Sequence, residues 1–136
     1  MSLFFLNINA QTSEAYDWTR VMNAIIQVES KGNPNAHNPS SDCAGILQMT
    51  KIAVRECNQI LQRKKSDKRY TYQDRYDAEK SKEMFILLQE HFNSEHDIEK
   101  AIKCWNCGFY TKSWRKCSID YHKRVMEYYN NNNGEE

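Results

Sequence analysis

The chain has 136 residues, of which 40% are hydrophobic and 27% charged, and its 19 Lys and Arg nearly balance its 18 Asp and Glu, for a net charge of +1. This composition is typical of a single globular domain and excludes a disordered or fibrous chain. The charge balance predicts no binding to nucleic acid, and no apolar run approaches the roughly 18 residues of a membrane span.

The first residues are apolar and end in a small residue. Residues 3–10 (LFFLNINA) are similar to the end of a secretory signal, although no Lys or Arg precedes them. The alternative is an apolar strap that packs on the domain. We therefore expect a strap or signal remnant at 1–13, a domain at 14–129 and a polar tail at 130–136.

Apolar residues recur at helical spacing along the chain, which predicts an all-α fold. The expected helices span 14–30, 50–62, 77–92 and 97–107, with a last one after Ser118. Residues 32–44 and 63–69 are expected to be loops, the second (RKKSDKR) being either a solvated charge run or a contact for an anionic polymer. The inner face of the second helix is expected to consist of Ile52, Ala53, Cys57, Ile60 and Leu61.

Five cysteines are many for a cytosolic chain of this length, and the odd count leaves at least one of them outside any intramolecular disulfide. Cys104 and Cys107 form a CxxC motif. Two interpretations are a zinc site completed by Cys117 and by His122 or His91, and a redox site. Because neither a second CxxC nor a strand pattern accompanies the motif, buried thiols or a disulfide are favoured.

Glu29 interrupts the apolar stripe of the first expected helix. At 100° per residue, its side chain falls within about 20° of those of Trp18 and Met22. A carboxylate is seldom buried without a reason, and the last turn of a helix disfavours negative charge. Both effects would raise the pKa of Glu29, which suits a general acid at neutral pH. The alternative is that the helix frays after Val28 and that Glu29 turns to solvent.

Four short segments in chain order carry a family resemblance. They are Val28-Glu29-Ser30, Gly45-Ile46-Leu47-Gln48-Met49, residues 101–108 (AIKCWNCG), and Tyr121 followed four residues later by Val125. Together they resemble the soluble lytic transglycosylase domain of the lysozyme-like superfamily, over roughly residues 16–129. The resemblance implies an all-α, lysozyme-like domain with a glycan-binding cleft. The sequence departs from the family pattern at Leu47, Trp105, Cys43 and Cys107.

The resemblance also implies a role for each matched residue. Glu29 matches the catalytic acid and base, and Tyr121 matches the tyrosine that orients it. Residues implied to contact the substrate are Gln48, Asn106, Trp105 as an aromatic platform, and either Ser40 or Ser41.

The implied reaction is the cleavage of peptidoglycan without water. Glu29 would protonate the oxygen of the β-1,4 bond between N-acetylmuramic acid and N-acetylglucosamine, and would then act as base on the 6-hydroxyl, giving a 1,6-anhydro product. No metal or cofactor is expected. Two alternatives stay open: a lysozyme-type hydrolase in which Asp42 or a neighbour places water, and a non-catalytic domain that binds glycan or scaffolds an assembly.

The expected partner is the peptidoglycan strand, with wall-spanning secretion or conjugation machinery as a further candidate. We expect a periplasmic or secreted monomer without a transmembrane segment or a nucleic-acid partner.

Overall fold

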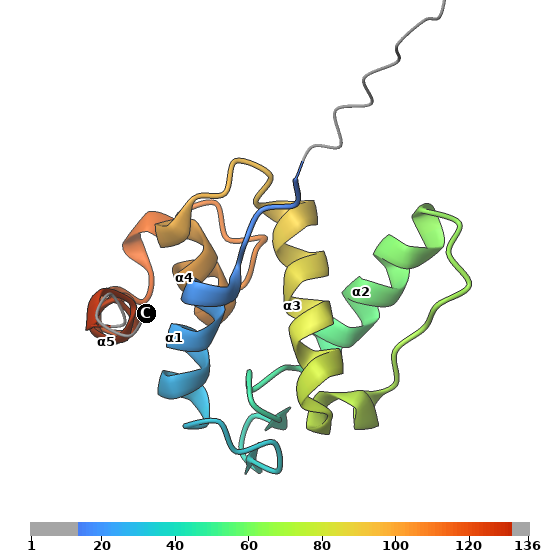
Figure 1. The fold of residues 1–136 in the computed structure, drawn as a ribbon, viewed down its shortest axis with the longest axis horizontal. Coiled ribbons are helices and arrows are strands. Elements are labelled where there is room, and N and C mark those ends of the chain that lie inside the picture. Colours follow the sequence, from blue (N-terminus) through green and yellow to red (C-terminus); the bar gives the residue numbers. More distant parts are fainter. Residues whose placement is uncertain (1–13, 132–136) are drawn as a thin grey trace, which may run out of the picture.

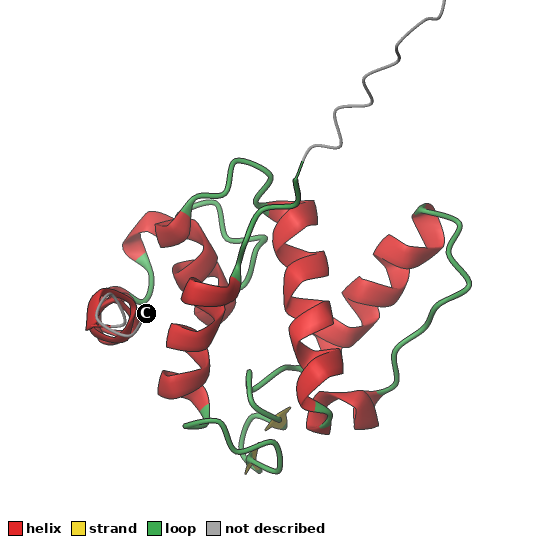
Figure 2. Ribbon diagram, viewed as in Figure 1, coloured by secondary structure: helices red, strands yellow, loops and turns green. Residues whose placement is uncertain are grey.

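The computed structural model describes residues 14–131 and is mainly helical (Figures 1 and 2), which confirms the all-α prediction. Its α-helices are α1 (Thr19–Glu29), α2 (Lys51–Arg63), α3 (Ala78–Phe92), α4 (Ile98–Cys107) and α5 (Ile119–Asn131), with 3₁₀ helices η1 (Tyr72–Tyr76) and η2 (Trp114–Lys116). The interpretation of residues 1–13 as strap or signal lies outside the described residues, as does most of the expected tail. Within residues 14–131, no helix combines the length and the apolar character needed to cross a bilayer.

Side-chain caps explain where three helices begin. The side chains of Thr50, Asp77 and Asp97 each accept a hydrogen bond from the backbone N–H three residues later, at 3.0 Å. The first helix begins later than the predicted residue 14. Asp17 accepts the N–H of Thr19 at 2.9 Å, and this local bond holds a turn ahead of the helix.

A small hairpin lies in the segment predicted to be a loop at 32–44. Its strands are β1 (His37–Asn38) and β2 (Cys43–Ala44), which pair antiparallel with His37 opposite Ala44. Two residues are too few to produce the alternating pattern by which a strand is recognised in a sequence. In Figure 1 the hairpin lies near the end of α1 and the start of α3, and it therefore shapes the surroundings of Glu29.

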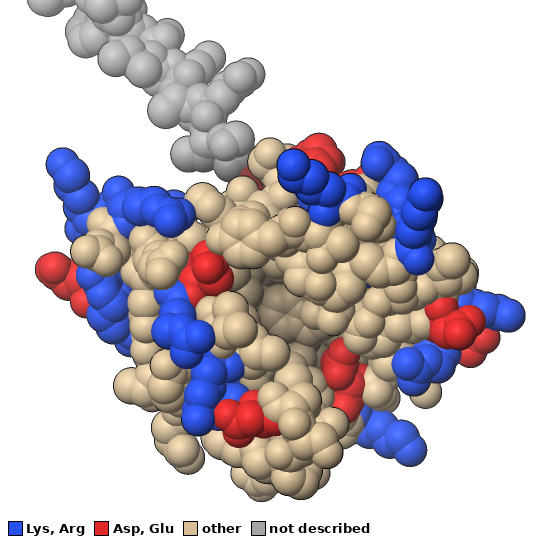
Figure 3. Space-filling view, turned by 180° about the vertical axis from the view of Figure 1, so that it is seen from behind, with Lys and Arg blue, Asp and Glu red and all other residues tan. Residues whose placement is uncertain are grey.

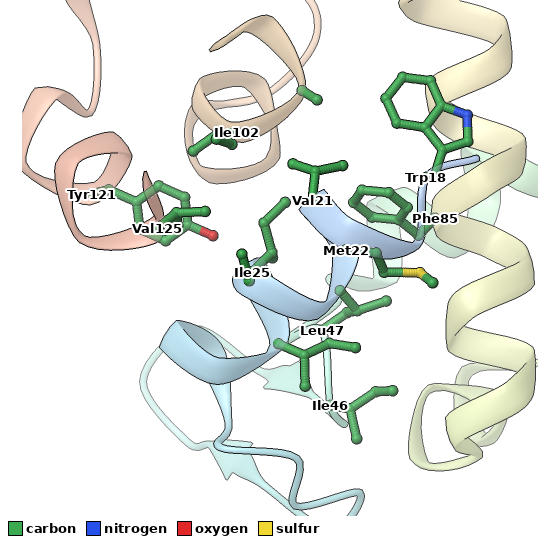
Figure 4. Packing of buried hydrophobic residues seen from close by; sticks show 13 residues of the cluster. Trp18, Val21, Met22, Ile25, Ile46, Leu47, Phe85, Ile102, Tyr121 and Val125 are labelled. Atoms are coloured by element: carbon green, nitrogen blue, oxygen red, sulfur yellow. The ribbon is translucent and has the colours of Figure 1, made fainter. Parts of the chain in front are cut away.

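The main core lies where α1 meets α4 and α5 (Figure 4). The apolar stripe predicted for the first helix is buried there, with Trp18 and Val21 each 1% exposed. The other side chains drawn and labelled in this cluster are Met22, Ile25, Ile46, Leu47, Phe85, Ile102, Tyr121 and Val125. This packing buries Ile25 and Ile26 next to the end of α1, so the core positions the last turn, which carries Glu29.

A second apolar cluster joins α2 to α3, which lie side by side in Figure 1. The prediction that Ile52 belongs to this core is wrong, because its side chain is 60% exposed. The residues that α2 buries are Val54, Cys57, Ile60 and Leu61. Ile52 lies about 200° around the helix from Val54, and it therefore faces away from this cluster.

Candidate active site

Glu29 is the last residue of α1, and its carboxyl group is partly buried. Its Oε1 accepts a hydrogen bond of 2.6 Å from the hydroxyl of Tyr121. Burial raises the pKa of Glu29, while the Tyr121 hydroxyl and the charge of Arg124 counteract only part of this shift. The negative end of the α1 dipole acts in the same direction as burial. The site therefore holds a carboxyl group with an increased tendency to stay protonated.

Tyr121 presents its hydroxyl from the first turn of α5. The ring is 6% exposed and packs in the main core, so the phenol has little freedom to turn away from Glu29 (Figure 4). The guanidinium carbon of Arg124, one turn further along α5, lies 5.8 Å from the centre of this ring. The helix α5 thus supplies both the hydrogen-bond donor to Glu29 and a positive charge that lowers the pKa of Glu29.

Ser30, next to Glu29, ties the end of α1 to the segment at 45–49. Its hydroxyl donates to the carbonyl of Ile46 at 2.7 Å. Gly45 begins this segment with φ at +82°, and a Cβ there would come within 1.7 Å of the Arg75 carbonyl oxygen. Only glycine fits this position, because a side chain would meet both the unfavourable φ and the backbone of Arg75.

Arg75, in η1, is buried and connects the hairpin to the 45–49 segment by hydrogen bonds. Its side chain is 4% exposed. Its Nη1 donates to the carbonyls of Asp42 at 2.6 Å and Met49 at 3.2 Å. Sequence reasoning missed this residue, because a single arginine in a polar stretch carries no pattern that distinguishes a buried side chain from a solvated one.

Gln48 uses its amide nitrogen to maintain the backbone around it. This Nε2 donates to the carbonyls of Ala36 at 3.1 Å and of Gly45 at 3.0 Å. These two bonds occupy both N–H groups of the amide. The side-chain oxygen of Gln48 is therefore the atom with which it would accept a hydrogen bond from a ligand.

Asn106 and Glu29 are connected through the start of α5. The Asn106 Oδ1 accepts a hydrogen bond from the hydroxyl of Ser118, just before α5, and Glu29 is bonded to Tyr121, three residues further on. Side chains three residues apart at a helix start are neighbours. Glu29 and Asn106 are therefore brought to the same end of α5.

A pocket of about 310 Å³ lies between α2 and the end of α4. The face of the molecule in Figure 3 is hollowed near its centre, and few charged side chains surround the hollow. The residues that line the pocket are Gln48, Met49, Thr50, Ile52, Ala53, Glu56, Leu88, Phe92, Cys104, Trp105, Asn106, Cys107, Gly108, Phe109 and Tyr110. A mostly uncharged lining with a few amides and aromatic rings is suited to a neutral sugar.

Trp105 has both a structural and a lining position. Its indole N–H donates to the carbonyl of Leu47 at 3.0 Å, and its ring lies 4.8 Å from that of Phe85. It also lines the pocket, together with Gln48 and Asn106. Three of the residues implied by the family resemblance are therefore collected around one pocket.

Ser40 and Ser41 lie on the exposed turn between β1 and β2, and neither lines this pocket. The backbone N–H of Ser40 donates to Asn38 Oδ1 at 3.0 Å, and the Ser41 hydroxyl accepts the N–H of Cys43 at 3.4 Å. These bonds organise the turn itself.

Asp42 follows these serines and belongs to a cluster of charges. Its carboxylate lies 2.8 Å from Nε2 of His37 and 3.2 Å from Nζ of Lys51. The hydrogen bonds to His37 and Lys51 hold the pKa of Asp42 below its usual range. Asp42 is therefore a weak base held by two basic groups.

The cysteines do not assemble into a metal-binding group in the described part of the chain. Among residues 14–131, no three His, Cys, Asp or Glu side chains converge in a way that could hold an ion. Cys104 is buried, whereas Cys107 and Cys117 are partly exposed.

Sequence reasoning missed the part of the pocket wall that comes from α2 and from the segment after α4. The hydroxyl of Tyr110 donates to Glu56 Oε2 at 3.0 Å, which links these two walls. Ile52, predicted from the sequence to lie on the inner face of its helix, carried a signal for this wall, because it is apolar but out of phase with Val54, Cys57 and Leu61.

The transglycosylase SLT domain family matches residues 6–127 of the chain. Comparisons with curated proteins and with solved structures gave no significant match.

Proposed function

Because the chain belongs to the transglycosylase SLT domain family, whose members act on the cell wall, we propose that it cleaves peptidoglycan glycan strands with Glu29 as the only acid–base group. The observation that carries this proposal is the bond of 2.6 Å from the buried hydroxyl of Tyr121 to the carboxyl of Glu29. A raised pKa keeps a fraction of this carboxyl protonated near neutral pH, as a general acid requires.

The proposed reaction takes place in two proton transfers. Glu29 gives its proton to the glycosidic oxygen, and the bond from that oxygen to C1 of N-acetylmuramic acid breaks while the N-acetyl group of the same sugar assists. The Glu29 carboxylate then accepts the proton of the 6-hydroxyl as O6 bonds to C1. The product is a 1,6-anhydro sugar, and Glu29 ends protonated as it began.

The binding of the sugars is assigned to the pocket lined by Gln48, Trp105 and Asn106, whose lining does not include Glu29. Gln48 offers a side-chain oxygen, Asn106 offers its amide, and Trp105 offers an aromatic ring. Ser40 and Ser41 would contact a strand only if it extends over the hairpin, beyond the pocket. We assign the glycan strand, and not a small soluble sugar, because the family to which the chain belongs acts on the cell wall.

The hydrolytic alternative requires a second group that activates water. The candidate for this group is Asp42 or a neighbour. The hydrogen bonds to His37 and Lys51 lower the pKa of Asp42 and so make it a weaker base, which argues against Asp42 in this role. Analysis of the products decides between the two routes.

Digestion of purified sacculi, followed by mass analysis of the released fragments, tests the proposal. Fragments that end in 1,6-anhydromuramic acid are the expected products. Reducing ends, each heavier by one water, would assign the protein to the hydrolases. An intact sacculus after exhaustive digestion, with glycan binding retained, would favour the non-catalytic scaffold.

A further inference from the structure

The two cysteines that flank the segment after α4 are in contact with each other. Cys107 ends α4 and Cys117 follows η2, and their Sγ atoms are 2.6 Å apart. This is closer than unbonded sulfur atoms pack and approaches the S–S bond length of about 2.05 Å. We propose that Cys107 and Cys117 form an intramolecular disulfide that clamps residues 108–116 onto α4.

The bonds on both sides of the cysteines hold them in register. Asn106 and Ser118, the next pair outward, are joined by a hydrogen bond. On the inner side, the buried amine of Lys103 donates to the carbonyl of Arg115 at 2.6 Å. The cysteines are thus held opposite each other by neighbours that do not depend on the S–S bond.

The clamped segment forms part of the pocket wall. Gly108, Phe109 and Tyr110 line the pocket, and the Phe109 ring stacks on that of Phe92 with centroids 5.0 Å apart. Tyr110 reaches across to Glu56 on α2. A cross-link at the base of this segment would restrict the position of all three lining residues.

The cellular compartment in which members of the family act supports the oxidised, disulfide-bonded state of Cys107 and Cys117. These members act on the cell wall, outside the reducing cytoplasm, where disulfides persist. Bond formation needs a small-molecule or protein disulfide as oxidant. The Cys117 thiolate attacks that disulfide and releases one thiolate, and Cys107 then displaces the second from the mixed disulfide on Cys117. Two protons leave the cysteines, and two electrons reduce the oxidant to a dithiol.

Geometry, and not acidity, separates the other three thiols from this pairing. Burial raises the pKa of Cys57 to about 12 and that of Cys104 to about 11, but it also raises the pKa of Cys107 to about 12. Only Cys107 and Cys117 are found with their Sγ atoms in contact among the described residues. The Sγ of Cys57 is also bonded to the Met84 carbonyl, and Cys43 lies on β2. The odd cysteine count is accounted for by one disulfide and three thiols.

Peptide mapping tests the pairing directly. The full chain is folded in a glutathione redox buffer, alkylated in denaturant without reductant, and cleaved with chymotrypsin, which separates Cys104 from Cys107 by cutting after Trp105. We expect a fragment containing Cys107 linked to one containing Cys117, and alkylated Cys43, Cys57 and Cys104. Alkylation of both Cys107 and Cys117, or a link to Cys104, would overturn the proposal.

The stability of the native protein gives a second measurement. A loop of this size should contribute a melting-temperature shift of about 5–10 °C when it is cross-linked. Dithiothreitol should lower the melting temperature of the wild type and of the matched control Cys43→Ser by this amount, and should not affect the double variant Cys107→Ser/Cys117→Ser. An equal effect on all three proteins would contradict a clamp. Neither measurement depends on the proposed enzymatic activity, so the two proposals can fail separately.

Discussion

The hydroxyl of Tyr121 donates a hydrogen bond of 2.6 Å to the carboxyl of Glu29, a residue 92 positions earlier in the chain. The bond joins the start of α5 to the end of α1. A donor to a carboxylate favours the ionised form, yet burial outweighs it and the pKa of Glu29 is raised. The phenol therefore orients a carboxyl whose protonation is controlled mainly by burial.

Replacing Glu29 with Gln should abolish cleavage and leave the fold intact. The amide keeps the shape but neither donates an acid proton nor accepts one, so turnover of sacculi should fall by at least about 100-fold. Glycan binding, measured by pelleting with sacculi, should persist because Gln48 and Asn106 are unchanged. Glu127→Gln, an exposed change on α5, is the control. Near-normal cleavage by the Glu29 variant would refute the catalytic assignment.

The same variant should also change how stability depends on pH. A carboxyl with a raised folded-state pKa destabilises the fold as pH rises from the ordinary value of glutamate through the raised one, because the buried group must then ionise. Glu29→Gln removes this cost. Its melting temperature relative to the wild type should be higher at about pH 8 than at about pH 4. If the melting temperatures of the variant and the wild type differed by the same amount at both pH values, Glu29 would have an ordinary pKa in the folded protein.

Tyr121→Phe should lower turnover by about 10- to 1000-fold, which is the size of a positioning effect. The ring remains in the core, so the melting temperature should change little. Tyr128→Phe, on the same helix but 41% exposed, is the matched control and should behave as wild type. Equal turnover in the two variants would reduce Tyr121 to a core residue.

Arg124→Gln should move the alkaline limb of the pH–activity profile to higher pH. The positive charge of Arg124 lowers the pKa of Glu29, so its removal allows that pKa to rise further and keeps the acid protonated over a wider range. The profile of kcat/KM for sacculus digestion measures the limb. Lys123→Gln, which removes an adjacent exposed cation, should leave the limb in place. A shift of equal size in both variants would indicate a general charge effect.

Gly45→Ala and its control Gly32→Ala test how tightly the segment that carries Gln48 packs against Arg75. Both glycines have φ at +82°, but only at Gly45 would a Cβ meet the Arg75 carbonyl, at 1.7 Å. Gly32→Ala should cost about 1–2 kcal/mol from backbone strain, and Gly45→Ala at least about 3 kcal/mol in denaturant unfolding. Equal costs would mean that the contact with Arg75 is easily relieved.

The helices and the unusual position of Glu29 follow from local patterns in the sequence. Periodic apolar residues indicate α1 to α5, because a helix brings every third or fourth side chain to one face. The caps at Thr50 and Asp97 depend on a backbone N–H only three residues away. The spacing of 100° per residue that places Glu29 on the same face as Trp18 is likewise a property of one helix. It could therefore be predicted without knowing which other elements pack against that helix.

The partners of these residues were decided only by the tertiary structure. Tyr121 reaches Glu29, Arg75 enters the hairpin, and Cys117 meets Cys107 because separate elements pack around a shared core. Ile52 is apolar and still faces the pocket. A sequence pattern records the face of an element on which a residue lies, but the contact made by that face depends on how distant elements pack, and no local periodicity encodes that packing.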